Sequence, residues 1–467
     1  MLLERIYEDD LSQGAWLIGC QATREAIIID PQRDISRYVD VLKKARLNLI
    51  AVAETHIHAD FLSGTAELSA ATGAMCYLSN CGGPDWLYAW PSGSNLDVTF
   101  VGEGDTIKVG NVTLKILHTP GHTPEHICFL VFDAGRSEPV GLVSGDFIFV
   151  GDLGRPDLLE TAAGVDGVME ESASVLFHTC EKLKSLPSYI QIWPGHGAGS
   201  ACGKALGAVS QSTLGYEQQT SPPLQLVNDK QSFVDFMLEG QPEPPLYFAR
   251  MKRMNRDGIP ILGNLPTPIR IEDAEELREK ALECTVIDTR NWEDVRDGHL
   301  KGTIWSKATG DFHRFAGSFV DEVEEIIFIT TQENLDRAIR NAVRIGLDRI
   351  VGWADPSLLE EMDGLETMPE ITAQELIART QEDILDVRRM PEFEKGNIPF
   401  ACNIAHTRLM DRLDDINSEK EWVVHCLGGS RSAAACMALK RRGYNVTNLA
   451  GGYSGWLAVK NTSTTST

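Results

Sequence analysis

Thr55-His56-Ile57-His58-Ala59-Asp60-Phe61 is the stretch of sequence that decides the fold, and it directly follows an apolar run, LIAVAE, at residues 49–54. Apolar runs also precede His122 in HTPGH, Asp146 in VSGD and His196 in WPGH. Strands that end in polar side chains are typical of layered α/β folds, which build their sites on strand-end loops. Unpartnered histidines and carboxylates are costly to bury, and a zinc or iron ion would partner them. The pattern therefore predicts an α/β fold with a metal site.

These segments resemble the metallo-β-lactamase family, whose fold is an αββα sandwich with metal ligands on strand-end loops. The full family motif is H-x-H-x-D-H, and this chain has Phe61 where the last histidine would stand. Phenylalanine cannot be a ligand, so a centre with two metals is disfavoured and a single metal is expected.

Within this fold the chain resembles persulfide dioxygenases, which use one Fe(II) held by two histidines and one carboxylate. The resemblance assigns the metal ligands to His56, His122 and Asp146. Such a ligand set leaves neighbouring positions open for substrate and O₂. It further implies that His58, Asp60 and His196 orient the ligands and the metal-bound waters. One Fe(II) per chain is expected, although zinc accepts the same ligands and can be present in preparations.

Cys202 stands in SACGK, shortly after His196. A similar cysteine occurs in the branch of the family that is fused to rhodanese domains. One interpretation is a thiol near the metal that relays sulfur, and the other is a buried structural cysteine. The sequence leaves both open.

A repeat with a period of roughly 100 residues fills the last part of the chain, which indicates domain duplication. VIDTRNWEDVRDGHLKGTI at 286–304 is similar to ILDVRRMPEFEKGNIPFACNI at 384–404. The predicted strand EEIIFIT at 324–330 likewise matches EWVVHC at 421–426.

The second copy contains a cysteine in a glycine-rich turn. WVVHCLGGSRSAAACMALKRRGY at 422–444 predicts a strand, the turn and a helix, so Cys426 would lie at a helix N-terminus. Backbone N–H groups in such a turn form a nest for anions, and we expect Cys426 to be a thiolate near neutral pH.

This loop matches the rhodanese motif C-x-x-G-x-R at Cys426, Gly429 and Arg431, and LDVR at 385–388 and GGYSGW at 451–456 are further hallmarks. The resemblance implies that these three residues catalyse sulfur transfer through a persulfide on Cys426. A cysteine-dependent phosphatase is the alternative, but its C-x5-R loop is one residue longer.

The first copy departs from this pattern, because no cysteine occurs between Cys284 and Cys402 and the loop position reads ITTQENLDR at 329–337. We therefore predict an inactive domain that supports packing and orientation. The predicted organisation is a metallo-β-lactamase-fold domain at 1–245, a linker at 246–266, an inactive rhodanese-like domain at 267–362 and a rhodanese domain with the catalytic cysteine at 367–461.

Composition excludes several other classes of protein. The 467 residues include 43 basic and 67 acidic ones, a net charge of −24 that repels nucleic acid and anionic membranes. The amino-terminal segment lacks the apolar core of a signal peptide, and the ten cysteines contain no C-x-x-C pair. We expect a cytoplasmic protein, and a homo-oligomer because relatives of this fold often form dimers or tetramers.

Together these features predict an enzyme of sulfide and persulfide detoxification. It would oxidise a low-molecular-weight thiol persulfide with Fe(II) and O₂ to sulfite, and pass sulfur through Cys426 to sulfite, giving thiosulfate. One alternative is a glyoxalase-II-like thioester hydrolase with a rhodanese appended. Another is a sulfur carrier or redox sensor that relies on Cys426 alone. The identity of the thiol is left open.

Overall fold

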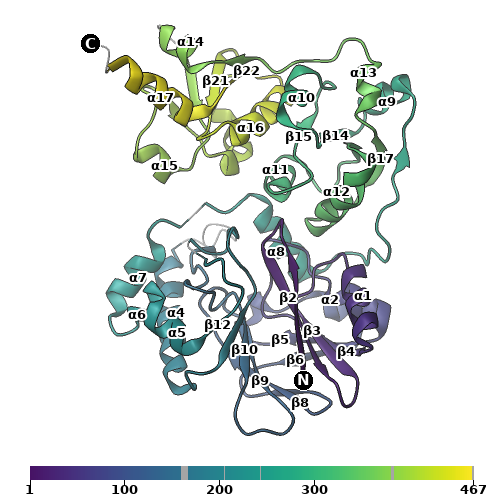
Figure 1. The fold of residues 1–467 in the computed structure, drawn as a ribbon, viewed down its shortest axis with the longest axis vertical. Coiled ribbons are helices and arrows are strands. Elements are labelled where there is room, and N and C mark those ends of the chain that lie inside the picture. The colour runs from purple at the N-terminus through teal and green to yellow at the C-terminus, as the bar shows by residue number, and fades with distance from the viewer. Residues whose placement is uncertain (159–166, 205, 242, 380–382, 465–467) are drawn as a thin grey trace. The chain divides into compact units, whose positions relative to one another are not determined.

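The computed structural model describes residues 1–467 except 159–166, 205, 242, 380–382 and 465–467 (Figure 1). The chain divides into two compact units, Met1–Asn264 and Leu265–Thr467. No helix in the described part of the chain is long and apolar enough to cross a membrane.

The first unit contains two six-stranded sheets. The strands of one sheet, in spatial order, are β1 (Leu2–Glu8), β2 (Gln13–Cys20), β3 (Glu25–Ile29), β4 (Asn48–Ala53), β5 (Met75–Ser79) and β6 (Val98–Val101). Those of the other are β12 (Ser212–Thr213), β11 (Gln191–Pro194), β10 (Gly141–Gly145), β9 (Ile127–Phe132), β8 (Val112–His118) and β7 (Thr106–Val109).

Helices cover the outer faces of these sheets. The side chains of β3, which point alternately to its two faces, show why such a cover is needed. Ile27 and Ile29 lie in a core shared by both sheets, whereas Ala26 and Ile28 lie in an outer core. Successive side chains of a strand point to opposite faces, so an apolar run such as AIII is buried on both sides.

The helices that contribute to the outer cores are α1 (Ser36–Ala45) and α2 (Thr65–Thr72) on one sheet, and α4 (Met169–Lys182), α6 (Pro222–Gln225) and α7 (Lys230–Leu238) on the other. A further helix, α5 (Leu214–Thr220), directly follows β12. The layers confirm the predicted αββα sandwich.

One more helix, α8 (Tyr247–Asp257), falls within the segment 246–266 that we expect to be a linker. It belongs to the first compact unit. The Asn255 side chain on α8 donates to the carbonyl oxygens of His58 (2.8 Å) and Phe61 (2.7 Å). This helix therefore holds the loop that carries the H-x-H-x-D-F motif.

The second unit contains two five-stranded parallel sheets with the same strand order, which confirms the duplication. The first copy has the order β13 (Ile269–Arg270), β17 (Ile350–Ala354), β16 (Ile326–Ile329), β14 (Thr285–Asp288), β15 (Ile304–Trp305). The second has β18 (Glu370–Ile371), β22 (Asn445–Leu449), β21 (Glu421–His425), β19 (Asp383–Asp386), β20 (Cys402–Asn403).

The helices of the first copy are α9 (Ala274–Lys280), α10 (Trp292–Asp297), α11 (Phe312–Phe319), α12 (Gln332–Arg344) and α13 (Ser357–Glu360). Those of the second are α14 (Ala373–Ala378), α15 (Met390–Glu394), α16 (Ser430–Arg441) and α17 (Gly452–Thr464). Both copies are rhodanese-like α/β folds, as predicted.

The repeated D-x-R motif has the same structural role in both copies. Arg290 donates to Asp288 at 2.7 Å and to the Gly298 carbonyl oxygen at 2.6 Å. Arg388 makes the equivalent bonds, to Asp386 at 2.6 Å and to the Gly396 carbonyl oxygen at 2.8 Å. Each arginine thus ties the end of a strand to the turn that follows the next helix.

Candidate metal centre and cysteine loop

The three predicted metal ligands come together at the strand ends of the first unit. One ligand-type atom from each of His56, His122 and Asp146 lies within 4.8 Å of the others. Asp146 Oδ2 is 3.6 Å from His122 Nε2 and 4.0 Å from His56 Nε2. Both carboxylate oxygens of Asp146 are buried without a hydrogen-bond partner among the described residues, a costly arrangement that a cation would satisfy. The donor set therefore fits a metal ion.

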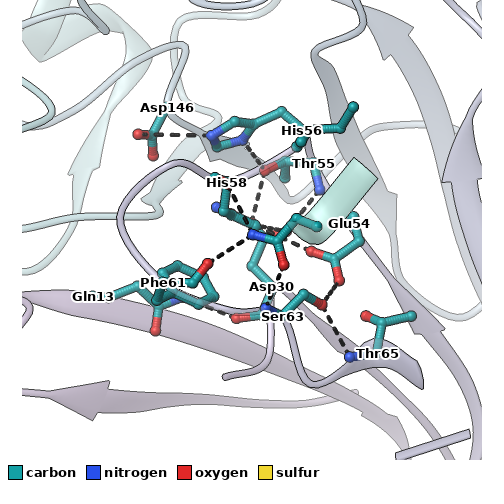
Figure 2. A network of polar contacts seen from close by, with 12 residues as sticks. Gln13, Asp30, Glu54, Thr55, His56, His58, Phe61, Ser63, Thr65 and Asp146 are labelled. Atoms are coloured by element: carbon teal, nitrogen blue, oxygen red, sulfur yellow. Dashed lines mark hydrogen bonds and ion pairs between the residues drawn. The ribbon is translucent and has the colours of Figure 1, made fainter. Parts of the chain in front are cut away.

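The hydrogen bonds of the two histidines leave Nε2 of each ring free for a metal. The Thr55 hydroxyl donates to Asp30 Oδ2 at 2.8 Å, so it accepts from His56 Nδ1 at 2.9 Å (Figure 2). His122 Nδ1 lies 3.1 Å from the Arg155 carbonyl oxygen, which can only accept. Partners of this kind fix the tautomer and orientation of metal-binding histidines.

The charge states of these rings also suit metal binding. Burial and the neighbouring histidines hold the pKa of His56 well below its usual value. Burial lowers the pKa of His122 to about 3. Both rings are therefore neutral near pH 7, which is the form that binds metals.

His58 lies beside this cluster but makes different contacts. Its Nε2 is 3.2 Å from Asp30 Oδ1 and 3.1 Å from Glu54 Oε2 (Figure 2). Although burial alone would lower it, these two carboxylates raise the pKa of His58 well above its usual value. The ring of Phe61 packs against His58 with centroids 4.4 Å apart. His58 is thus a charged partner of Asp30 and Glu54, and the ligand-type atoms of these three buried side chains also lie within 4.8 Å of one another.

Asp60, His196 and Cys202 form a second buried group, whose ligand-type atoms also lie within 4.8 Å of one another. His196 Nε2 is 3.4 Å from Asp60 Oδ2 and 3.5 Å from Asp146 Oδ1. Burial, together with the charges of Asp60 and Asp146, raises the pKa of Cys202 well above its usual value. The structure thus places Cys202 beside the predicted ligands, with its thiol protonated.

Gly195 of the WPGH segment stands where a side chain would collide with this site. A Cβ atom there would lie 2.8 Å from Asp146 Oδ1. The glycine before His196 therefore lets β11 approach the carboxylate closely.

The sequence reasoning missed His126, whose ring stacks on that of His56 at a centroid distance of 5.1 Å. Its Nε2 accepts from the backbone N–H of Asp146 at 3.1 Å, and its Nδ1 contacts the Thr119 hydroxyl at 2.8 Å. His126 follows His122 in HTPGHTPEH, so the signal was present in the sequence. Asp30 and Glu54 also follow apolar runs, at residues 26–29 and 49–53, so both had a strand-end signal. Asn255 carried no such signal, because only the fold brings it to the site.

In the second unit, the loop after β21 surrounds the sulfur of Cys426. The Gly429 N–H donates to Cys426 Sγ at 3.1 Å, and the Ser432 hydroxyl lies 3.6 Å from it. Gly429 has a φ of +114°, which L side chains rarely adopt and which explains the glycine.

Arg431 lies in the same loop and forms a paired contact with Glu392. Its two terminal nitrogens donate to the two carboxylate oxygens of Glu392 at 2.7 and 2.8 Å. Although burial alone would lower it, Glu392 raises the pKa of Arg431. The pair fixes the guanidinium five residues after Cys426, at the start of the helix that follows the cysteine loop.

The first copy lacks this loop altogether. Only Thr330 and Thr331 separate β16 from α12, and the Thr331 hydroxyl caps that helix by accepting from the Asn334 N–H. A turn of this length has no room for a nest around a sulfur atom, and it carries no cysteine.

Comparisons with known proteins agree with this architecture. The metallo-beta-lactamase superfamily model matches residues 9–196, and the rhodanese-like domain model matches residues 372–459. A crystal structure of a metallo-beta-lactamase from Staphylococcus aureus subsp. aureus COL is 41% identical, with a TM-score of 0.67, and the match covers 76% of this chain and 99% of that one.

Two curated enzymes match the first unit. The mitochondrial persulfide dioxygenase of Mus musculus is 29% identical over 199 residues, 42% of this chain and 68% of its own length. A hydroxyacylglutathione hydrolase of Hydrogenovibrio crunogenus is 33% identical over 142 residues, 30% of this chain and 47% of its own length.

The chain therefore belongs to the metallo-β-lactamase superfamily. Its metal-binding unit is related to persulfide dioxygenases and to glyoxalase II, and a rhodanese domain follows at its carboxyl-terminal side.

Proposed function

We propose that this protein oxidises a low-molecular-weight thiol persulfide to sulfite in its first unit and transfers a sulfane sulfur to sulfite through Cys426 in its second. The observation that carries this proposal is that a two-histidine, one-carboxylate cluster and a glycine-rich loop around a cysteine sulfur occur in one chain. The persulfide dioxygenase relative supports the first activity, and the rhodanese-like match supports the second.

His56, His122 and Asp146 would hold one Fe(II), and bound iron would supply the activation of O₂ and the binding of the persulfide sulfur. The chain's own residues set up this site. Thr55 and Arg155 orient the two rings, and the ion pairs of His58 keep that histidine from becoming a further ligand. The reaction balances as persulfide plus O₂ plus water giving thiol, sulfite and two protons.

In the second unit the Cys426 thiolate attacks the outer sulfur of another persulfide and releases the thiol. Sulfite then attacks the sulfur held on Cys426, so that thiosulfate leaves and the thiolate is restored. The Gly429 N–H and the Arg431 guanidinium stabilise the sulfur anion in both steps.

Cys202 would serve as an additional sulfur acceptor beside the metal, a role that its place beside Asp60 and His196 supports. Because its thiol is protonated, this role requires that a neighbouring carboxylate, such as that of Asp146, take the thiol proton as sulfur is accepted. A Cys202→Ser variant tests this role. Loss of turnover with unchanged iron content is the expected result, whereas wild-type turnover would leave Cys202 a structural residue.

A second candidate function is thioester hydrolysis by a two-metal centre. The group of Asp60, His196 and Cys202 beside Asp146 favours it, because these side chains offer a set of donors for a second ion. The hydroxyacylglutathione hydrolase relative supports it as well.

Metal content measured together with O₂ uptake separates the two functions. The dioxygenase predicts a single iron per chain and persulfide-dependent O₂ consumption with glutathione persulfide or coenzyme A persulfide. A protein that holds two zinc ions, cleaves a glutathione thioester and consumes no O₂ would instead be a hydrolase.

A further inference from the structure

A cavity of about 460 Å³ lies beside the Cys426 loop in the second unit. Gly428, Gly429 and Ser430 form part of its wall: the two glycines belong to the turn after Cys426, where the Gly429 N–H donates to Cys426 Sγ, and Ser430 begins α16. Much of the remaining wall comes from the first copy, whose equivalent loop has no cysteine. The cavity therefore joins the reactive loop of one copy to the surface of the other.

The first copy contributes an aromatic cluster to this cavity. Trp292, Trp305 and Phe315 all line it. The ring centroid of Trp305 lies 5.2 Å from that of Trp292 and 6.1 Å from that of Phe315. Trp305 is buried, whereas Trp292 is only partly buried, so part of its indole surface is open.

Glu370 of the second copy fixes the position of this aromatic wall. Its Oε1 accepts from Trp292 Nε1 at 2.9 Å and from Asn448 Nδ2 at 2.7 Å, and its Oε2 accepts from Arg296 at 3.0 Å. Trp292 and Arg296 lie on α10 of the first copy. Asn448 lies on β22, the neighbour of β21, and the cysteine loop follows β21. The indole is thus held in one orientation relative to the reactive loop.

We propose that this cavity binds the organic part of the thiol persulfide that loads Cys426, so that the inactive copy recognises the sulfur carrier. The inference rests on the proposed sulfur transfer through Cys426. Small inorganic anions gain little binding energy from contact with an aromatic surface of this extent. A carrier that contains several amide groups, which are planar, can lay the faces of those groups against the indole of Trp292. Glutathione and coenzyme A both have this chemistry.

The test compares sulfur donors that need the cavity with one that does not. The full-length protein is assayed without O₂, so that oxidation in the first unit cannot consume the donor. Cyanide accepts the sulfur, and kcat/KM is measured for glutathione persulfide, coenzyme A persulfide and thiosulfate. Trp292→Ala removes the stacking surface, and Thr309→Trp, at an exposed position lining the cavity, fills the space.

Both variants are expected to lose about tenfold in kcat/KM with at least one organic persulfide, an amount equal to about 1.4 kcal/mol. The loss should lie mainly in KM, and the values for thiosulfate should stay within about twofold of the unmodified protein. The organic persulfide whose kcat/KM falls more identifies the thiol that carries the sulfur. Trp292→Phe, which keeps a ring, should recover part of the loss, and Val323→Ala, at a site in the first copy that is 66% exposed and outside the cavity lining, should change nothing.

The inference is overturned if thiosulfate and the organic donors lose activity together, or if neither variant discriminates between them. If the Trp292→Ala variant does not fold, the kcat/KM values of the Thr309→Trp variant alone test the inference. Turnover of thiosulfate by the unmodified protein tests the proposed function separately: without that turnover the sulfurtransferase proposal fails, whereas turnover with no discrimination refutes only the role of the cavity.

Discussion

Thr55→Val is the substitution that best tests how the chain positions its metal ligands. The Thr55 hydroxyl is 2.9 Å from His56 Nδ1 and 2.8 Å from Asp30 Oδ2, and valine removes both hydrogen bonds while nearly keeping the volume. The backbone N–H of residue 55 still donates to Asp30 Oδ1 at 2.7 Å, so the loop itself is retained.

The expected effect follows from two buried atoms, His56 Nδ1 and Asp30 Oδ2, that each lose a hydrogen-bond partner. An unsatisfied buried donor costs about 1–3 kcal/mol, which lowers the thermal stability of the metal-free protein modestly. Loss of a partner of a metal-binding histidine typically weakens metal affinity or activity about 10–100-fold. In free energy this equals about 1.4–2.8 kcal/mol of metal binding.

The assay is competition for Fe(II) or zinc against a chelator of known affinity, with a thermal melt of the metal-free protein alongside. Thr65→Val is the matched control, because the Thr65 hydroxyl is also buried but has no hydrogen-bond partner among the described residues (Figure 2). If Thr55→Val holds the metal as tightly as Thr65→Val does, the hydroxyl does not position His56 and the reasoning is wrong.

Three further predictions concern the two sites. His122→Ala should lose its metal and at least about 100-fold in persulfide-dependent O₂ uptake, because one of three ligands is gone, yet keep thiosulfate–cyanide sulfur transfer. Cys426→Ser should do the reverse, and loss of both activities in either variant would contradict independent sites. Although burial opposes ionisation, the hydrogen bonds and charge of Arg431 hold the pKa of Glu392 at about 2. A lowered carboxyl pKa stabilises the fold above the unfolded-state value of about 4.3, and this stabilisation is lost as the pH falls toward the folded-state value. Denaturant unfolding of Glu392→Gln should therefore show a deficit at pH 7 that shrinks between about pH 5 and pH 3, whereas a constant deficit would point to packing alone.

Local sequence patterns were sufficient for much of the architecture. The apolar runs before His56, Asp146 and His196 became β4, β10 and β11, because a strand buried on both faces needs an uninterrupted apolar run. The repeat was equally informative, since Asp288 with Arg290 and Asp386 with Arg388 make the same bonds in each copy. The glycine pattern after Cys426 likewise predicted a turn that only glycine adopts easily.

What the sequence alone determined was which chemical groups the chain offers: neutral imidazoles and carboxylates at strand ends, and one cysteine in a glycine-rich turn. Only the tertiary structure decided what each group can do. His56 and His58 are two residues apart, but the fold places Asp30 and Glu54 against His58 alone, which charges that ring and leaves His56 neutral. The reason is physical: the charge of a buried side chain depends on the groups within a few ångströms, and residues far apart in the chain supply them.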